Sequence, residues 1–246
     1  MSSAQPTMWR ALGFRDFRLV WSAQVFSELG DWAARVALAV LVLDRTGSKV
    51  LTAAVTGIGF LPWVGIGQAL AALADRFPRR SVMVVADAVR AVAFFALSVV
   101  EPVWALLVLA FVAATATPPF EAARAATIPE VVSEEGYGDA LALSNITFQA
   151  VVVLGYLFGG GLVVIVGART ALAINAGSFA VSAILLSFMT AGRIARRAAS
   201  VGASIRAAMH TIFEDAFLRR AAILAAVGGA AGIVGEALVA VYVREN

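Results

Sequence analysis

Long apolar stretches alternate with short polar segments along most of the chain. Four stretches without a charged residue reach or approach the ~20 residues that an α-helix needs to cross a bilayer. They are residues 50–74, 102–120, 140–168 and 170–192. Three further stretches of similar length include ionisable side chains: 17–43, 81–100 and 221–243. The pattern therefore predicts seven membrane-spanning helices in an all-α membrane protein.

The composition agrees with a chain that lies mostly in the bilayer. Of the 246 residues, 61% are hydrophobic and 14% are charged, and the mean hydropathy is +0.88. These values exclude a disordered tail or a soluble β-sandwich. The formal net charge is +3, and the basic residues are dispersed between apolar stretches. This distribution excludes a surface for nucleic acid.

The sequence has no motif of the common soluble enzymes. It contains no cysteine and one histidine, so it offers neither disulfides nor a thiolate or histidine metal cluster. The patterns G-x-x-x-x-G-K-[ST], H-E-x-x-H and G-x-S-x-G are absent. We therefore predict that the chain is not an enzyme and binds neither a metal nor a cofactor. The first 16 residues are polar and lack the features of a cleaved signal peptide.

Arginines are distributed unequally between the two predicted sides of the membrane. One side has 13: Arg10, Arg15, Arg18, Arg76, Arg79, Arg80, Arg124, Arg193, Arg196, Arg197, Arg206, Arg219 and Arg220. The other has four basic residues: Arg45, Lys49, Arg169 and Arg244. Basic residues favour the cytoplasmic side. We therefore expect a multi-pass protein of the cell membrane with a cytoplasmic N-terminus.

The connections between predicted helices are short except for one basic segment. This segment divides the chain into a six-helix bundle (1–192), a cytoplasmic linker (193–220) and one further helix (221–246). Within the linker, residues 205–213 have apolar residues at helical spacing beside His210. Two interpretations stay open: a helix lying on the membrane interface, or a solvated basic linker.

A polar stripe runs along the first predicted span. Gln24, Glu28, Asp31 and Arg35 are separated by four, three and four residues, which places them on one helical face. A charge at the bilayer centre costs at least ~3 kcal/mol, so the stripe should face the bundle or a water-filled cavity. The alternative is an Asp31–Arg35 pair that only fixes helix packing.

Other polar residues lie inside or beside later spans. Asp87 and Arg90 are three residues apart in the third span, and we expect a pair that ties this helix to the preceding loop; the alternative is contact with a substrate. Pro118 and Pro119 should bend or break the fourth span just before Glu121 and Arg124, and broken helices often border transport sites.

The fifth and seventh spans also carry polar residues. Ser144, Asn145, Thr147 and Gln149 begin the fifth, where they line the same cavity or link helices. Glu236 stands alone in the seventh, either as a proton carrier or near the outer interface. The spacings Gly155-xxx-Gly159 and Gly228-xxx-Gly232 predict close approach between helices.

The loop after the second span carries a recognisable motif. It reads Ala71-Ala72-Leu73-Ala74-Asp75-Arg76-Phe77-Pro78-Arg79-Arg80. This run resembles the G-x-L-A-D-R-x-G-R-R/K signature of the major facilitator superfamily, with Ala71 and Pro78 in place of the two glycines. The resemblance implies that Asp75, Arg76, Arg79 and Arg80, with Asp87 and Arg90 nearby, belong to a cytoplasmic gating motif.

Three further runs resemble the drug, macrolide and enterobactin exporters of that superfamily. They are Phe14-Arg15-Asp16-Phe17-Arg18 with Leu29-Gly30-Asp31, Arg124 with Pro129-Glu130, and Leu154-Gly155-Tyr156 with Gly159-Gly160. The resemblance implies a six-helix bundle of two inverted three-helix repeats, followed by one helix of a second bundle. In this family the first, fourth and seventh helices line the central cavity.

Together these features favour a secondary transporter for proton-coupled efflux of small amphipathic molecules. The expected pathway residues are Gln24, Glu28, Asp31, Arg35, Glu121, Arg124, Asn145, Gln149 and Glu236. The alternative is a truncated membrane fragment or adaptor that does not transport. Because about five helices of a complete transporter are missing, we expect transport to require a complementary half or self-association, besides the lipid bilayer, a small-molecule substrate and protons.

Overall fold

The computed structural model describes residues 8–64, 66–192, 214, 215 and 220. The predicted helices at 205–213 and 221–243, with His210, Glu236 and the second glycine pattern, lie outside these residues. The helices are η1 (Met8–Gly13), α1 (Arg15–Thr46), α2 (Lys49–Ile58), α3 (Leu61–Val64), α4 (Ile66–Ala74), α5 (Arg79–Val99), α6 (Val103–Thr115), α7 (Thr117–Val131), α8 (Glu134–Val166) and α9 (Ala168–Ser187).

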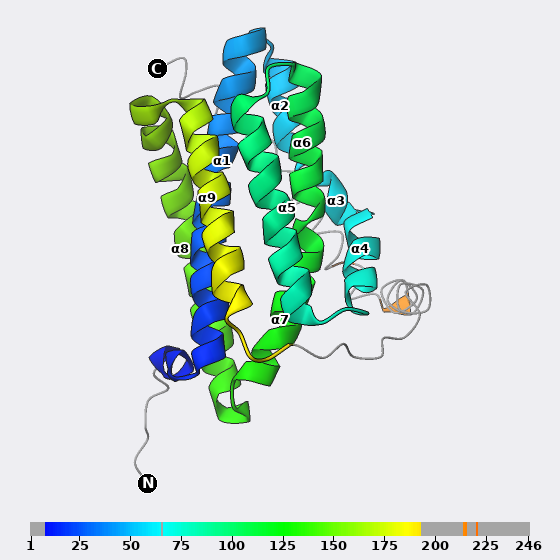
Figure 1. Ribbon diagram of the computed structural model, residues 1–246, viewed down its shortest axis with the longest axis vertical. Coiled ribbons are helices and arrows are strands. Elements are labelled where there is room, and N and C mark those ends of the chain that lie inside the picture. The colour runs from blue at the N-terminus through cyan, green and yellow to red at the C-terminus, as the bar shows by residue number, and fades with distance from the viewer. Residues whose placement is uncertain (1–7, 65, 193–213, 216–219, 221–246) are drawn as a thin grey trace.

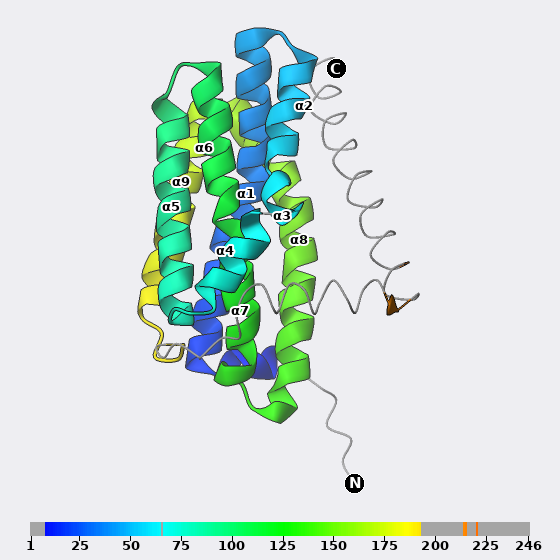
Figure 2. The same cartoon turned by 90° about the vertical axis from the view of Figure 1, so that its right-hand side faces the viewer.

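The chain runs up and down the long axis of a helical bundle (Figures 1 and 2). Helix α1, the α2–α4 segment, α5, the α6–α7 segment, α8 and α9 follow one another in alternating directions. In the described part of the chain, α5, α6–α7, α8 and α9 are each long and apolar enough to cross a membrane. The predicted all-α membrane fold is confirmed.

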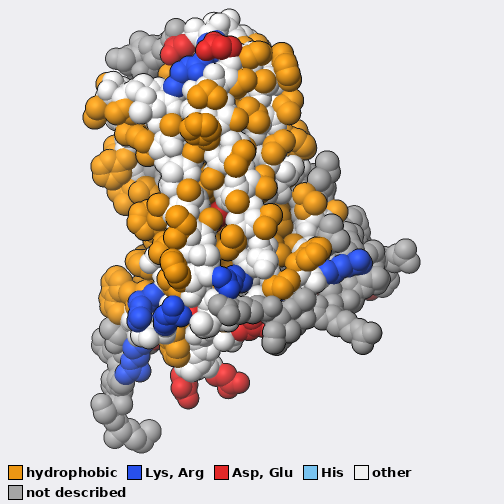
Figure 3. All heavy atoms as spheres, in the orientation of Figure 1, with side chains coloured by type: hydrophobic (Ala, Val, Ile, Leu, Met, Phe, Trp, Pro, Cys, Tyr) orange, Lys and Arg blue, Asp and Glu red, His pale blue; other side chains and the backbone are white. Residues whose placement is uncertain are grey.

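The outer surface of the bundle suits a bilayer. Apolar side chains cover the length of the bundle in Figure 3, and charged side chains gather mostly toward its two ends. Exposed apolar residues include Val92 and Phe95 on α5 and Leu157 and Val164 on α8. Soluble monomers rarely expose apolar patches of this extent.

The predicted second span, 50–74, is not one helix. It is divided into α2, α3 and α4. Glycine has a low helix propensity, and Gly57 and Gly59 lie where α2 ends. Pro62 cannot donate an N–H to a preceding turn, but it fits the second position of α3, where no donor is needed. The prediction of one continuous helix over 50–74 was therefore wrong. It gave the apolar composition more weight than the helix-breaking effect of the glycines and Pro62.

The fourth span is interrupted beside its two prolines, in line with the expected bend or break. Helix α6 ends at Thr115 and α7 begins at Thr117, with Pro118 and Pro119 in its first turn. Helix α7 continues to Val131, so Glu121 and Arg124 lie within a helix.

Helix α1 packs closely against α8 and α9 because the residues at the contacts are glycines, which have no β-carbon. A β-carbon on Gly159 of α8 would lie 2.7 Å from the Cα of Ala33, and one on Gly155 would lie 2.4 Å from the Cβ of Trp32. On the other side, a β-carbon on Gly30 would lie 2.3 Å from the Asn175 side-chain oxygen of α9. The close approach predicted from the first glycine pattern is confirmed.

Candidate functional site

A cavity of about 720 Å³ lies between α1, the α2–α3 segment, α5, α6, α7 and α8. A cavity of this size accommodates a drug-sized molecule. Eight of the residues predicted from the sequence line it: Gln24, Glu28, Asp31, Arg35, Arg90, Glu121, Arg124 and Asn145. The polar stripe of α1 therefore faces a cavity, as its spacing predicted.

Arg124 connects three of the helices around the cavity. Its Nη2 lies 2.5 Å from Glu121 Oε2, one turn earlier on α7, and its Nη1 donates to Gln24 Oε1 of α1 at 2.9 Å. The Gln24 amide in turn donates to the Ser144 carbonyl of α8 at 3.4 Å. Both partners of the Arg124–Glu121 ion pair are largely buried, so the pair is stronger than one in water.

Glu28 stands between the two ion pairs of the cavity. Its Oε2 is buried and has no hydrogen-bond partner among the described residues. The neighbouring carboxylates Glu121 and Asp31 are each paired with an arginine. Arg124 is near enough to interact with the charge of Glu28 but forms no ion pair with it, and a buried carboxylate that is not paired is costly in its charged form. Glu28 therefore differs from Glu121 and Asp31 in having no arginine ion pair among the described residues.

Asp31 and Arg35 form the predicted pair on α1, with 3.9 Å between Oδ2 and Nη2. The Arg35 guanidinium also lies over two aromatic rings, 4.5 Å from the centre of Trp32 and 5.2 Å from that of Phe60. Phe60 lies in the break between α2 and α3. Arg35 therefore holds the broken segment against α1 beside the cavity.

The aromatic wall of the cavity is a feature that the sequence analysis missed. Trp32 contacts Phe148 of α8 edge-on, with 6.4 Å between ring centres, and lies 5.2 Å from the Tyr156 ring. Phe60, Trp63, Phe94 and Tyr137 also line the cavity. The helical spacing of Trp32 beside Glu28, Asp31 and Arg35 was a signal that could have found part of this wall.

Asn145 and Gln149 occupy different places on α8. Asn145 lines the cavity, whereas Gln149 is exposed and does not. Thr147 accepts a hydrogen bond from the Trp21 indole at 2.9 Å, and the Ser144 carbonyl binds Gln24. Polar residues of α8 thus both line the cavity and link helices.

Asp87 and Arg90 form a buried ion pair, as expected, but with different surroundings. Asp87 Oδ2 accepts a hydrogen bond from Ser182 of α9 at 2.5 Å, and the Arg90 guanidinium lies over Phe120 of α7 and Phe179 of α9. The expected tie to the preceding loop is wrong, because the pair lies two to three turns inside α5 and faces the neighbouring helices.

The motif at the start of α5 has an exposed part and a bonded part. Asp75 and Arg76 are exposed. Arg79 donates to the Ala126 carbonyl of α7 and lies 2.8 Å from Glu130, whereas Arg80 donates to the Ser187 carbonyl of α9. The two adjacent arginines therefore hold α5 against two different helices.

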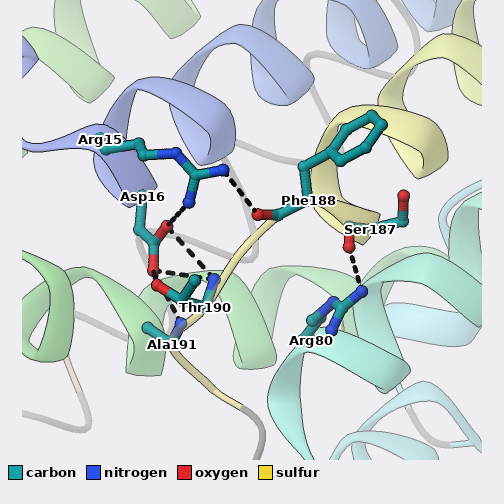
Figure 4. A network of polar contacts seen from close by, with 7 residues as sticks. All are labelled: Arg15, Asp16, Arg80, Ser187, Phe188, Thr190 and Ala191. Atoms are coloured by element: carbon teal, nitrogen blue, oxygen red, sulfur yellow. Dashed lines mark hydrogen bonds and ion pairs between the residues drawn. The ribbon is translucent and has the colours of Figure 1, made fainter.

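Figure 4 shows how the segment after α9 is held at the end of the bundle where η1 lies. Asp16 accepts hydrogen bonds from the Thr190 hydroxyl at 2.6 Å and from the Ala191 N–H at 2.7 Å, and Arg15 donates to the Phe188 carbonyl. Burial acts to raise the pKa of Asp16, but these hydrogen bonds, with Arg15 nearby, outweigh it and hold the pKa below its usual range.

A profile of the Major Facilitator Superfamily matches residues 20–245, nearly the whole chain. The chain belongs to the major facilitator superfamily. Proteins of this superfamily are membrane transporters, and the helical bundle with its polar, aromatic-lined cavity is consistent with that membership. Among the residues that the structure describes, no cluster of acidic or histidine side chains is placed to hold a metal ion.

Several curated proteins are similar to this member of the superfamily. An uncharacterised MFS-type transporter, YfiS of Bacillus subtilis, is 28% identical over 68% of this chain and 40% of its own length. Macrolide efflux protein A of Streptococcus pyogenes is 30% identical over 57% of this chain and 38% of its own. Multidrug efflux pump Tap of Mycobacterium tuberculosis is 30% identical over 68% of this chain and 42% of its own length. The chain therefore spans about two fifths of the length of the curated relatives it matches.

Proposed function

We propose that this major facilitator chain forms the N-terminal part of a secondary transporter that exports small amphipathic molecules in exchange for protons. Two relatives are named for macrolide and multidrug efflux, which supports export of molecules of that kind. Basic residues gather at the η1 end, which supports a cell-membrane protein with a cytoplasmic N-terminus. On this proposal residues 1–192 are the first bundle, and the residues beyond it, which the structure does not describe apart from 214, 215 and 220, are a linker (193–220) and the first helix of a second bundle (221–246).

The observation that carries this proposal is the position of Glu28 in a cavity with aromatic walls. The aromatic side chains give apolar contact surface, and the polar stripe of α1 gives hydrogen-bonding groups. Glu28 takes up a proton when the cavity is occluded from water and releases it when water or Arg124 approaches. Coupling then requires that the proton affinity of Glu28 differs between the inward- and outward-open states.

Alternating access needs a second wall for this cavity. The wall is supplied by a second bundle, either from a complementary half or from a second copy of this chain. Asp75 and Arg76, which are exposed, are the gating residues of the motif that respond to this second bundle. Asp87, Arg90, Arg79 and Arg80 hold the first bundle together during the movement. Glu236 lies outside the described residues and stays a candidate proton carrier on the sequence alone.

Uptake into proteoliposomes tests this function. The chain is purified from membranes with any protein that remains bound to it, reconstituted, and given an acidic interior so that outward proton flow drives uptake. We expect uptake of labelled erythromycin that disappears when a protonophore collapses the gradient. Uptake that is absent with and without the gradient would show that the chain is a non-transporting fragment or adaptor.

Two substitutions in this assay identify the proton carrier. Glu28→Gln should abolish gradient-driven uptake while leaving exchange of substrate across the membrane intact, because the neutral amide mimics the protonated acid. Asp31→Asn should weaken uptake without removing its dependence on the gradient, since Asp31 is paired with Arg35. Glu135→Gln removes an exposed carboxylate at the start of α8 and serves as the control. If Asp31→Asn alone removed the dependence, the proton role would pass to Asp31.

A further inference from the structure

One arginine of α5 contacts three elements of the bundle at once. The Arg90 side chain is 5% exposed and pairs with Asp87 of its own helix. Its guanidinium lies 4.3 Å from the ring centre of Phe120 on α7 and 4.6 Å from that of Phe179 on α9. Arg90 also lines the cavity. It is therefore a contact that joins α5 to both α7 and α9 close to the candidate site.

The position of Arg90 is fixed from the α9 side. Asp87 is completely buried, and while one carboxylate oxygen pairs with Arg90, the other accepts the Ser182 hydroxyl at 2.5 Å. Phe179, which stacks on Arg90, also stacks on Phe94 of α5 with 5.5 Å between ring centres. Since both sides of the Asp87 carboxylate are occupied, the guanidinium is held in one place.

The α7 side, by contrast, lies just after the interruption between two helices. Residue 116 separates α6 from α7, and Pro118 and Pro119 in the first turn of α7 have no N–H to donate. Phe120 is the next residue, and the one after it is Glu121, which holds Arg124 in the cavity. Stacking on Arg90 therefore restrains the turn of α7 from which the cavity charges project.

We propose that Arg90 is a positioning residue: through Phe120 it sets the place of the Glu121–Arg124 pair in the cavity. Arg90 acts at the edge of the cavity by holding Phe120, and it neither gates the chain nor carries a proton. The effect of this positioning on substrate binding rests on the proposed transport function, but the positioning itself does not. Its loss should move α7 even in a chain that transports nothing.

A single introduced cysteine reports the position of α7. The chain has no cysteine of its own, so the thiol of Ala125→Cys is the only one. Ala125 lies on α7 next to Arg124 and lines the cavity. The rate at which a water-soluble methanethiosulfonate reagent modifies this thiol in detergent depends on how α7 faces the cavity.

Two substitutions remove the stacking in different ways. Arg90→Lys keeps the charge beside Asp87 but loses the planar guanidinium. Phe120→Leu keeps an apolar side chain but loses the ring. It leaves the Asp87–Arg90 ion pair intact, so it still tests the proposal if Arg90→Lys fails to fold. We expect each to change the modification rate by about threefold or more, and the double variant to change it no further than either single variant, because contacting residues are coupled. Phe95→Leu is the matched control, since it makes the same change at an exposed ring on α5, the helix of Arg90.

The outcomes separate this inference from the transport function. Rates for Phe120→Leu equal to those of the Phe95→Leu control would overturn the positioning role, and so would effects of Arg90→Lys and Phe120→Leu that simply add. Coupled effects on the thiol in a chain without uptake activity would support the positioning role and count against the transporter. In an active chain, both substitutions should raise the KM for erythromycin more than they lower the maximal rate.

Discussion

The carboxylate of Asp16 at the start of α1 accepts a hydrogen bond of 2.6 Å from the hydroxyl of Thr190, which lies beyond the end of α9. The backbone N–H groups of Thr190 and Ala191 donate to the same carboxylate. One acidic side chain thus joins the beginning of the bundle to the point where the chain leaves it. This contact gives the Phe14-Arg15-Asp16-Phe17-Arg18 run a structural role.

Removing this contact should destabilise the bundle in a pH-dependent way. Asp16→Ala should lower the free energy of unfolding at neutral pH by about 1–3 kcal/mol, the usual value of hydrogen bonds to a charged group. Because the pKa of Asp16 is lowered in the folded protein, its contribution is complete above the unfolded value of about 3.9 and is lost as pH falls through the lower folded value.

Thermal unfolding in detergent checks the Asp16 prediction. The difference between the unsubstituted chain and Asp16→Ala should be constant from about pH 8 to pH 5 and should shrink below about pH 4. Thr190→Val, which removes only the hydroxyl, should show a smaller difference. A gap that closes already near neutral pH would contradict the assignment.

Glycine substitutions on α8 should separate packing from propensity. Gly159→Ala places a β-carbon against the backbone of Ala33, and we expect a loss of about 1–3 kcal/mol in unfolding free energy from overpacking. Gly160→Ala is the matched neighbour, because nothing lies within 4 Å of its added carbon. It should be neutral or stabilising by up to ~1 kcal/mol, since alanine favours helix. Equal effects in equilibrium unfolding would refute the close contact.

Much of the bundle was predictable because hydropathy and helical spacing act over many residues. The stripe from Gln24 to Arg35 had to face away from lipid, toward the bundle or a cavity, since lipid does not solvate charges. The break at Pro118 and Pro119 followed from missing backbone donors. These predictions depend on local chemistry, which the sequence contains directly.

Contacts between distant segments were not predictable in the same way. Nothing near Asp87 in the sequence indicates Ser182, and nothing near Arg90 indicates that Phe120 and Phe179 stack on it. That the α2–α3 break lines the cavity was not predicted from the sequence. The prediction of one helix over this uncharged stretch gave no weight to the helix-breaking effect of Pro62. Side-chain partners depend on helix rotation and packing, and one sequence does not fix these by periodicity alone.

Burial, rather than charge, should decide which ion pair matters for stability. Asp87→Ala leaves Arg90 buried without its partner, and we expect a loss of about 3–5 kcal/mol. Glu101→Ala removes a carboxylate that bridges Arg45 and Arg169 at the opposite end of the bundle, yet Glu101 is 73% exposed and the loss should be below about 1 kcal/mol. Equilibrium unfolding of the two variants in one detergent gives the ranking, and a reversed order would contradict it.

The motif before α5 should divide into gating and structural residues. Asp75→Ala removes an exposed side chain, so unfolding should change by no more than about 0.5 kcal/mol, while cysteine accessibility should report a shifted balance of conformations. Arg80→Ala loses the bond to the Ser187 carbonyl and should cost about 1 kcal/mol. Unchanged accessibility in Asp75→Ala, with substrate binding retained, would remove Asp75 from the gating role.

Trp32 should contribute to ligand binding through its ring. It lies under the Arg35 guanidinium and against Phe148 and Tyr156, so Trp32→Leu removes an aromatic surface in the cavity and frees Arg35 to move. Aromatic and cation–π contacts are each worth about 0.5–1.5 kcal/mol, which corresponds to roughly a twofold to tenfold weaker equilibrium binding of erythromycin. Trp104→Leu is the matched control, because Trp104 on α6 is 69% exposed and lies outside the cavity lining. Both variants should fold, since neither removes a buried ion pair. Equal affinity in the two variants would mean that the ligand does not use the aromatic wall, and the cavity would then have to bind through its polar stripe alone.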